Sequence, residues 1–553
     1  MAQSFITAPL RTMGKLLPTR PGMSPMIRAR ARRSGCLLMT LYLPACNMFS
    51  LPAVDLAPGY KPAAFVVPDS WRGSSPFVEA QPSDGELRQD WWTLFNDPNL
   101  NKLEEQALAA NPDLQAAAER FIQVRDMMMK ARSRLVPQLG FEFGASGNKD
   151  SVNSLFRAPD DQIYGTNVHY GGIASWEPDF WSAIRNETRV QIYRAEQRAA
   201  DFALARLSLQ AEIAEDYFTL RGYDAQNAIY RQSIEYYQKS LNIINDQFIG
   251  KIASDLDVAR AEYLLHSTEA KQIEIQTNRQ ITEHAIAILV NMSPSSFEIA
   301  PVDELQIAKF QVPQKIPASL LERRPDIASM EREMAQANRE IGIARAAFYP
   351  NVVFHAGGGF ADQGFNLAQL ANSLWSYGST VSVPIFDGGY RRAQLQQSWS
   401  AYRETEDKYR STVLNAFREV ENSLSRTKLI TTQVERQDAA VDAAVKTQYL
   451  SMELYKGGLN SSLDLIYAQV NTLTARIDAV AIKNELQKAS VALIRSLGGG
   501  WDRKQLPAEE QIQPFDSLQF TNLAKPEPAG GIDVKAGFGN TGVNNNLTTP
   551  AVP

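Results

Sequence analysis

The chain has few of the side chains that catalysis or metal binding requires. Among its 553 residues are two cysteines, and its four histidines (His169, His266, His284 and His355) fit no metal-ligand spacing. It has no Walker loop, no G-x-S-x-G motif and no redox cysteine pair. The run Gly357-Gly358-Gly359 lies at the end of an expected strand with no helix after it, which favours packing over nucleotide binding. We therefore expect no enzymatic activity and no cofactor.

Long apolar segments and a basic surface are also missing. No run of about 20 apolar residues exists, which excludes transmembrane helices. The formal net charge is −5, and it falls to −12 when residues 1–45, with seven basic and no acidic side chains, are left out. Because phosphate binding needs a basic footprint, we do not expect nucleic acid as a partner.

The N-terminus has the pattern of a bacterial lipoprotein export signal. A basic run from Arg28 to Arg33 precedes the apolar stretch from Cys36 to Leu43, which is too short to span a bilayer. Leu43-Pro44-Ala45-Cys46 resembles a lipobox, although proline is unusual there. We expect 1–45 to be a signal peptide, Cys46 to be acylated, and 46–86 to be an extended lipidated leader. An ordinary signal peptide or a buried cysteine is the alternative, and Met1, Met23 and Met26 remain open as start residues.

The chain repeats itself. Asn111–Leu114 aligns with Arg324–Ile327 at a shift of 213, and farther on a shift of 207 pairs Gly250 with Gly457. A period of this length is no solenoid repeat. We assign the first copy to residues 87–299 and the second to residues 300–502. Residues 503–553 are the C-terminal equatorial segment and a tail that we expect to be disordered.

Helical and strand periodicity alternate in the same order in both copies. The expected helices cover 99–136, 185–249, 253–292, 320–348, 390–455 and 463–497. The expected strands cover 139–145, 168–176, 351–360 and 374–386.

The long helices have coiled-coil spacing and no proline. Apolar residues step by four and three along two predicted seams. These are Ala200, Leu204, Leu207, Ala211, Ala214 and Phe218, and Ile466, Val470, Leu473, Ile477 and Val480. At 1.5 Å per residue each copy forms a rod about 100 Å long, with two strands at one end and a glycine turn at the other. Gly498-Gly499-Gly500 predicts the end of the last helix.

Four strands cannot close a barrel, and lipid does not tolerate open strand edges. If the strands lie in a membrane, several chains must combine, and three chains supply twelve strands, an even number typical of outer-membrane barrels. Aromatic residues such as Phe141, Tyr170 and Trp375 fit that setting. A soluble sheet with helical arms is the alternative.

Five motifs, taken together, are highly specific. They are Trp91-Trp92-x-x-Phe95-x-Asp97-Pro98, Leu321-Glu322-Arg323-Arg324-Pro325-Asp326-Ile327, Ala346-Ala347-Phe348-Tyr349-Pro350, Pro384-Ile385-Phe386-Asp387-Gly388-Gly389 and Leu497-Gly498-Gly499-Gly500-Trp501. Over about residues 87–502 the chain resembles the bacterial outer-membrane efflux channels of the TolC/OprM/NodT type, and its lipobox resembles the lipoprotein branch. The resemblance implies a mainly α protein with transmembrane β-strands. It would be a homotrimer with a twelve-strand β-barrel, a periplasmic α-helical coiled-coil tunnel and a mixed equatorial domain.

The resemblance also implies that the periplasmic tips of the helices close the tunnel and dock an adaptor protein. The tip residues here are Gly250, Ser254, Gly457, Gly458 and Ser461. Glycine permits the positive φ of a tight turn. The two serines are placed to cap the returning helices, so a structural role is as well supported as docking.

Four further tip residues are candidates for the aperture. Asp464, repeated in three copies, would form a carboxylate ring that favours cations, or it complements the dipole of its own helix. Tyr467 occupies a position where many relatives have a second aspartate. Asp257 and Arg260 of the other hairpin are expected to hold the closed state through bonds between helices.

We therefore expect a passive outer-membrane exit duct for small molecules, lipid-anchored and extending into the periplasm. Its expected partners are a periplasmic adaptor (membrane fusion protein), an inner-membrane pump of the RND type, and outer-membrane lipid. A type I-like protein secretion conduit and a non-conducting coiled-coil tether are the alternatives. The sequence does not name the substrate.

Overall fold

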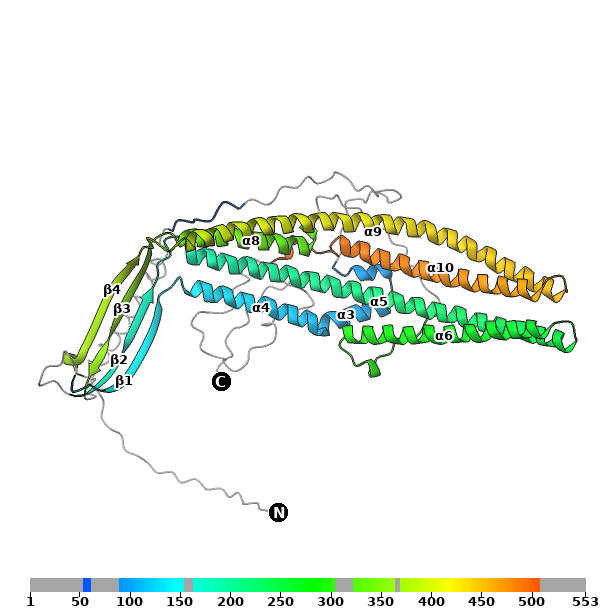
Figure 1. Ribbon diagram of the computed structural model, residues 1–553, viewed down its shortest axis with the longest axis horizontal. Helices are drawn as coiled ribbons and strands as arrows, with labels where there is room; N and C mark the ends of the chain where they lie inside the picture. The colour runs from blue at the N-terminus through cyan, green and yellow to red at the C-terminus, as the bar shows by residue number, and fades with distance from the viewer. Residues whose placement is uncertain (1–52, 61–88, 154–162, 304–321, 364–368, 508–553) are drawn as a thin grey trace, which may run out of the picture. The chain divides into compact units, whose positions relative to one another are not determined.

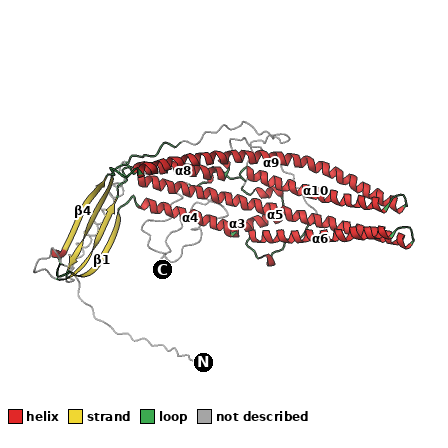
Figure 2. Cartoon of the chain, viewed as in Figure 1, coloured by secondary structure: helices red, strands yellow, loops and turns green. Residues whose placement is uncertain are grey.

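The structure is a computed structural model that describes residues 53–60, 89–153, 163–303, 322–363 and 369–507. Figures 1 and 2 show its helices and its one described sheet. Several sequence predictions lie outside the described residues. These are the signal peptide 1–45, Cys46, most of the leader 46–86, the start of the helix expected over 320–348 and the tail beyond 507.

Both repeats contain the predicted elements in the predicted order. The first has η1 (Trp91–Phe95), α3 (Pro98–Ala110), α4 (Pro112–Ser133), β1 (Gln138–Lys149), β2 (Tyr164–Trp176), α5 (Ala183–Ile249) and α6 (Asp255–Leu289). The short η2 (Pro294–Ser296) ends the first repeat. The second has α8 (Pro325–Ala346), β3 (Asn351–Asp362), η3 (Leu370–Asn372), β4 (Ser373–Ser382), α9 (Tyr390–Lys456) and α10 (Ser462–Ser496), and η4 (Arg503–Gln505) follows it. The long helices α5 and α9 both have 67 residues, and the returning helices α6 and α10 both have 35. The duplication therefore extends to element length.

Several predicted boundaries differ from the structure, and proline explains two of the differences. The helix expected over 99–136 is two helices, because the Asn111 side chain accepts from the amides of Asp113 and Leu114 and starts α4 anew at Pro112. The strand expected to reach 386 ends at Ser382. Pro384 has no amide hydrogen to donate to a ladder.

The four strands form one antiparallel sheet in the order β1-β2-β3-β4. The β2–β3 pair joins the two repeats, with Trp176 opposite Phe354 and Gly172 opposite Gly358. Strands β1 and β4 are the edges, so each leaves one row of backbone groups without a partner in the described sheet.

The register divides the sheet into two chemically different faces, because cross-strand partners point the same way. One face is mostly apolar and aromatic. It carries Leu139, Phe141, Phe143, Ala145, Val168, Tyr170, Gly172, Ala174, Trp176, Val352, Phe354, Ala356, Gly358, Phe360, Trp375, Tyr377 and Val381. The opposite face is mostly small or polar, with Glu142, His169 and His355 among its residues, and it also carries Ile173, Val353 and Leu374. Trp375 and Tyr377 on the apolar face are 75% and 81% exposed in the single chain.

The helices pack side by side in an order that matches the strands. Helix α5 packs against α4, α6, α8 and α10, and α9 packs against α8 and α10. Helices α4 and α6 therefore lie on one flank and α9 lies on the other (Figure 1). Among the described helices, none combines the length and the hydrophobicity that crossing a bilayer demands.

One predicted seam is confirmed and the other is wrong. In α5, Ala200, Leu207, Ala211, Ala214 and Phe218 are buried and Leu204 is half-buried. In α10 the buried stripe is shifted by a residue, to Leu465, Ala468 and Thr472, while Val470 is exposed. Helix α10 packs on both α9 and α5, and the positions that these two helices cover differ by a residue from the predicted stripe.

The main core contains a buried carboxyl group without a hydrogen-bond partner. Glu104 of α3 is fully buried beside Leu100, Leu103 and Ala107, and neither of its oxygens has a partner among the described residues. Burial raises the pKa of Glu104 well above its ordinary value, and the charge of Arg206 opposes this only in part. Burial therefore favours the neutral acid form of Glu104 in the folded chain.

This neutral acid predicts a specific pH dependence of stability. In the unfolded chain Glu104 ionises above pH 4.5, so its contribution to stability declines as pH rises from there toward the raised folded pKa. We expect Glu104→Met to raise the thermal midpoint more at pH 7.5 than at pH 5, by the equivalent of about 1–3 kcal/mol. Exposed Glu105 offers the matched control, Glu105→Met. Equal shifts of the Glu104→Met midpoint at both pH values would contradict the assignment.

Candidate functional site at the helical tips

Helices α5 and α6 are joined by a short turn. The amide of Gly250 bonds to Asp246 O, and Lys251 takes the left-handed conformation with φ +59°. Ser254 caps α6, accepting from the Asp257 amide, and the Asp257 carboxylate accepts from the Ser254 amide in return. The predicted cap is confirmed.

The turn between α9 and α10 has the same length and the same backbone conformation, with Gly458 in the left-handed position that Lys251 occupies in the first turn. Gly458 has φ +72°, as predicted for the tip glycines, but Gly457 has φ −79° and Gly250 has φ −73°. The prediction of positive φ is therefore wrong for those two glycines. Ser461 accepts from the Asp464 amide and caps α10, as predicted.

A hydrogen bond joins the two hairpins at their tips. The hydroxyl of Ser462, the first residue of α10, donates to the Asp257 carboxylate of α6. The Ser462 and Ser254 hydrogen bonds hold the pKa of Asp257 below its ordinary value. Arg260 contacts Asp257 within α6, at 4.0 Å, so in the described chain the bond between helices is made by Asp257.

Further polar links follow below this bond. The Tyr237 hydroxyl donates to Gln469 O at 3.0 Å, and the Gln469 side-chain amide donates to Ser240 Oγ at 2.7 Å. Farther along, Arg476 donates to the Gln232 side chain at 2.8 Å. All of them join α5 to α10, so within one chain the two hairpins are held as a unit.

A buried apolar cluster lies beside these links. It contains Tyr237, Leu241, Ile244, Ala261, Leu264, Leu265, Met452, Tyr455 and Leu465, which come from all four tip helices. Burial, together with the nearby charge of Asp257, raises the pKa of Tyr455. Separating the hairpins would expose this cluster as well as break the polar links.

The other two aperture candidates lie outside this interface. Asp464 is exposed and bonds to Ser461 of its own cap at 2.6 Å. Tyr467 is 59% exposed. The structure thus brings Asp257 to the second hairpin and leaves Asp464 and Tyr467 open to solvent.

Sequence analysis missed Ser462, Tyr237 and Gln469. Asp257 and Ser462 are 205 residues apart, and the sequence contains no signal that pairs them. A serine directly after a capping serine is locally unremarkable.

The tips also expose apolar side chains. Ile249 and Ile252 are 78% and 81% exposed at the first turn, and Leu459 is 79% exposed at the second. Phe248 is 42% exposed. These four residues, which we call the tip patch, form a surface of the kind that contacts another protein.

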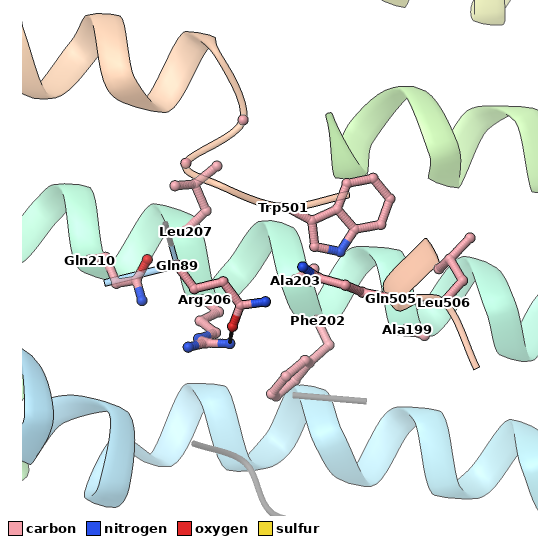
Figure 3. Close-up of a pocket in the computed structure, with 12 residues that line it drawn as sticks. Gln89, Ala199, Phe202, Ala203, Arg206, Leu207, Gln210, Trp501, Gln505 and Leu506 are labelled. Carbon is pink, nitrogen blue, oxygen red and sulfur yellow. Dashed lines mark hydrogen bonds between the residues drawn. The ribbon is translucent and has the colours of Figure 1, made fainter. Parts of the chain in front are cut away.

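Far from the tips, a small cavity lies between α5 and the segment after α10 (Figure 3). Its volume is about 40 Å³, and its lining includes Arg206, Gln210 and Trp501. Arg206 donates to Gln89 Oε1 at 3.2 Å across it. That volume suits one or two water molecules, so the cavity is a packing feature and no route for a larger molecule.

Comparison with known proteins gives one consistent result. The model of the family described as outer membrane efflux protein matches residues 103–291 and 316–499. The pyoverdine export outer membrane protein OpmQ of Pseudomonas aeruginosa is 28% identical over 470 residues, covering 83% of this chain and 97% of that protein. Nodulation protein T of Rhizobium leguminosarum bv. trifolii is 29% identical over 419 residues, covering 74% and 88%.

Solved structures agree. The outer-membrane channel OprN aligns with a TM-score of 0.75 at 26% identity, covering 80% of this chain and 99% of that chain. The family resemblance inferred from the five motifs is confirmed.

The bond between Asp257 and Ser462 can be tested by removing one hydroxyl. We expect Ser462→Ala to increase hydrogen exchange in the first turns of both α6 and α10, because a hydrogen bond to a charged group contributes about 1.5–3 kcal/mol, roughly tenfold or more in local opening. The lowered pKa of Asp257 means that the bond contributes above about pH 4 and is lost as pH falls below its folded value.

Ser461→Ala is the matched control, since Ser461 bonds within its own hairpin. It should loosen α10 and leave α6 unchanged. If Ser462→Ala also affects α10 alone, the bond does not hold the hairpins together.

Proposed function

The chain belongs to the outer membrane efflux protein family, and on that premise we propose that three copies form the passive exit duct of a tripartite efflux system in the outer membrane. The observation that carries the proposal is that the sheet and the helices of the single chain each have two uncovered edges, and that these edges lie on the same two sides of the chain.

The sheet supports assembly of several chains. Edge strands β1 and β4 are exposed along nearly their whole length. If β4 of one copy pairs with β1 of the next, the open backbone groups are satisfied. Three copies then supply twelve strands, and the apolar face, with its aromatic residues, faces lipid while the polar face lines the lumen.

The helices support the same assembly. Exposed apolar side chains lie along the α6 flank (Tyr263, Ile273, Ile281 and Ile288) and along the α9 flank (Leu414, Leu429, Tyr449 and Leu454). Such flanks suit a head-to-tail contact that closes into a ring. The ring would enclose a tunnel between helices about 100 Å long.

The tips support a gate with two kinds of junction. Within one chain, Asp257 of the first hairpin meets Ser462 of the second. At the repeat shift of 207, the residues equivalent to Asp257 and Ser462 are Asp464 and Asp255. Between neighbouring copies, Asp464 would thus face Asp255, a pair of carboxylates that repel each other. We infer that the tunnel opens at the junctions between copies, and that the Asp464 carboxylates favour cations there.

The remaining parts of the proposal concern partners. The tip patch is a suitable docking surface for a periplasmic adaptor, which would open the gate by contact and couple the duct to an inner-membrane pump of the RND type. The predicted acylation of Cys46 would add a lipid anchor. The duct itself would perform no covalent chemistry. OpmQ exports pyoverdine according to its name, and we propose an exported small molecule here without naming it.

Conductance tests the duct directly. We expect the purified protein to form ion-conducting channels in planar bilayers, and we expect deletion of the gene to sensitise cells to small toxic compounds. Channels combined with loss of a secreted polypeptide and unchanged sensitivity would instead indicate a secretion conduit. Absence of conductance, together with a coiled-coil assembly, would indicate a tether and refute the duct.

The gate has its own test. In Asp255→Ser, the new hydroxyl should donate to the Asp464 carboxylate of the neighbouring copy, as Ser462 donates to Asp257 within a copy. This added bond should hold the gate closed and lower the conductance severalfold. Asp478→Ser, at an exposed position farther along α10, is the control and should leave it unchanged. Conductance of Asp255→Ser at the wild-type level would show that opening does not occur between Asp464 and Asp255.

A further inference from the structure

A short piece of the N-terminal leader is bound to the helices. Residues 53–60, which we call the leader clasp, lie along α8 and the start of α5 (Figure 1). The Val54 amide donates to Phe180 O at 2.9 Å, and Arg345 of α8 donates to Leu56 O at 3.0 Å. The clasp thus contacts both repeats.

Asp55 is the centre of these contacts. Its Oδ1 accepts from Asn186 Nδ2 at 3.0 Å, and its Oδ2 accepts from Arg189 at 2.7 Å and Arg339 at 2.9 Å. Asn186 and Arg189 belong to α5 of the first repeat, and Arg339 belongs to α8 of the second. One carboxylate therefore joins the two repeats.

The helix surface is shaped to receive the clasp. Gly342 of α8 is buried under Ala57, and a Cβ at position 342 would come within 2.8 Å of Ala57 Cβ and 2.9 Å of both Ala57 Cα and Asn186 Nδ2. Contacts that short do not occur between real side chains. Gly342 is thus required for the clasp to lie this close to α8.

The clasp lies where α5 and α8 meet the two strands that join the repeats. Helix α5 starts seven residues after β2 ends, and α8 ends five residues before β3 begins. These two strands join the repeats through the β2–β3 pair. At the same level the Trp181 indole donates to Pro350 O at 2.8 Å and stacks on Tyr349. The clasp is therefore one of several links between α5 and α8, and these links lie at the helix ends next to the sheet.

We propose that the leader clasp is an intramolecular fastener that fixes α5 to α8 beside the sheet, so that any relative movement of the repeats is confined to the far tips. The inference does not depend on what the duct carries. Several groups support it electrostatically. Burial raises the pKa of Asp55, but its hydrogen bonds to Asn186, the Ala57 amide and Arg189, together with the charge of Arg339, outweigh this and lower it. The fastening therefore persists above about pH 4 and weakens as pH falls below the lowered value.

Hydrogen exchange of the purified full-length protein tests the clasp. We expect Gly342→Ala to displace it sterically and Asp55→Asn to weaken it electrostatically. Both should increase early deuterium uptake severalfold in 53–60, and measurably in 183–190 and 339–346. Uptake at the tips, 250–256 and 457–463, should stay unchanged.

The controls match each change. Gly378→Ala adds the same methyl group in β4, where nothing lies within 4 Å, and Asp303→Asn removes an exposed ion pair with Arg231. Neither should affect 53–60. Wild-type exchange of 53–60 in Gly342→Ala would refute the binding, and release of 53–60 with unchanged exchange in 183–190 and 339–346 would refute the fastening.

Discussion

The structure depends on the backbone hydrogen bonds that β1 and β4 cannot make within the described chain. The unpaired backbone groups of an open strand edge can bond to another strand, and in lipid no water is present to bond to them instead. Because each long helix continues directly from a strand, the order of the helices copies the order of the strands. The sheet and the helices are thus open on the same flanks. A single set of neighbours can complete both layers, which is why assembly, membrane insertion and tunnel formation are one event in the proposed duct.

The duplication makes the two halves alike in shape and unlike in chemistry. The long helices have equal lengths, as do the returning helices, so the rods can alternate around a ring. At the tips the equivalent residues differ, with Arg260 in one hairpin and Tyr467 in the other, and with Asp255 against Ser462. A hydroxyl donates to a carboxylate, whereas a second carboxylate repels it. In the proposed duct, the junction within a copy, between Asp257 and Ser462, therefore holds, while the junction between copies, between Asp464 and Asp255, opens. The leader clasp strengthens the contrast, since it joins the repeats at the opposite end of the helices.

Local patterns predicted the elements well, because strand alternation and proline-free heptads reflect forces along the chain itself. The long helix expected over 185–249 is α5, and the strand expected over 351–360 is most of β3. The break at Asn111 was also readable in principle, because asparagine followed by proline is a helix-start signal. The buried stripe of α10 was not, since the positions that α9 and α5 cover depend on how these three helices pack. Nor was the neutral Glu104, whose sequence neighbours resemble those of any exposed glutamate.

By itself the sequence determined the repeat, the element order, the lengths of the rods and the family. Each of these follows from periodicity or from motifs that occupy contiguous residues. Only the tertiary structure decided that Asp257 bonds to Ser462, that Asp55 joins Asn186, Arg189 and Arg339, and that most apolar residues of the four strands share one face. The physical reason is distance along the chain. A hydrogen bond between residues more than a hundred positions apart depends on how every intervening helix packs, and no local pattern records that.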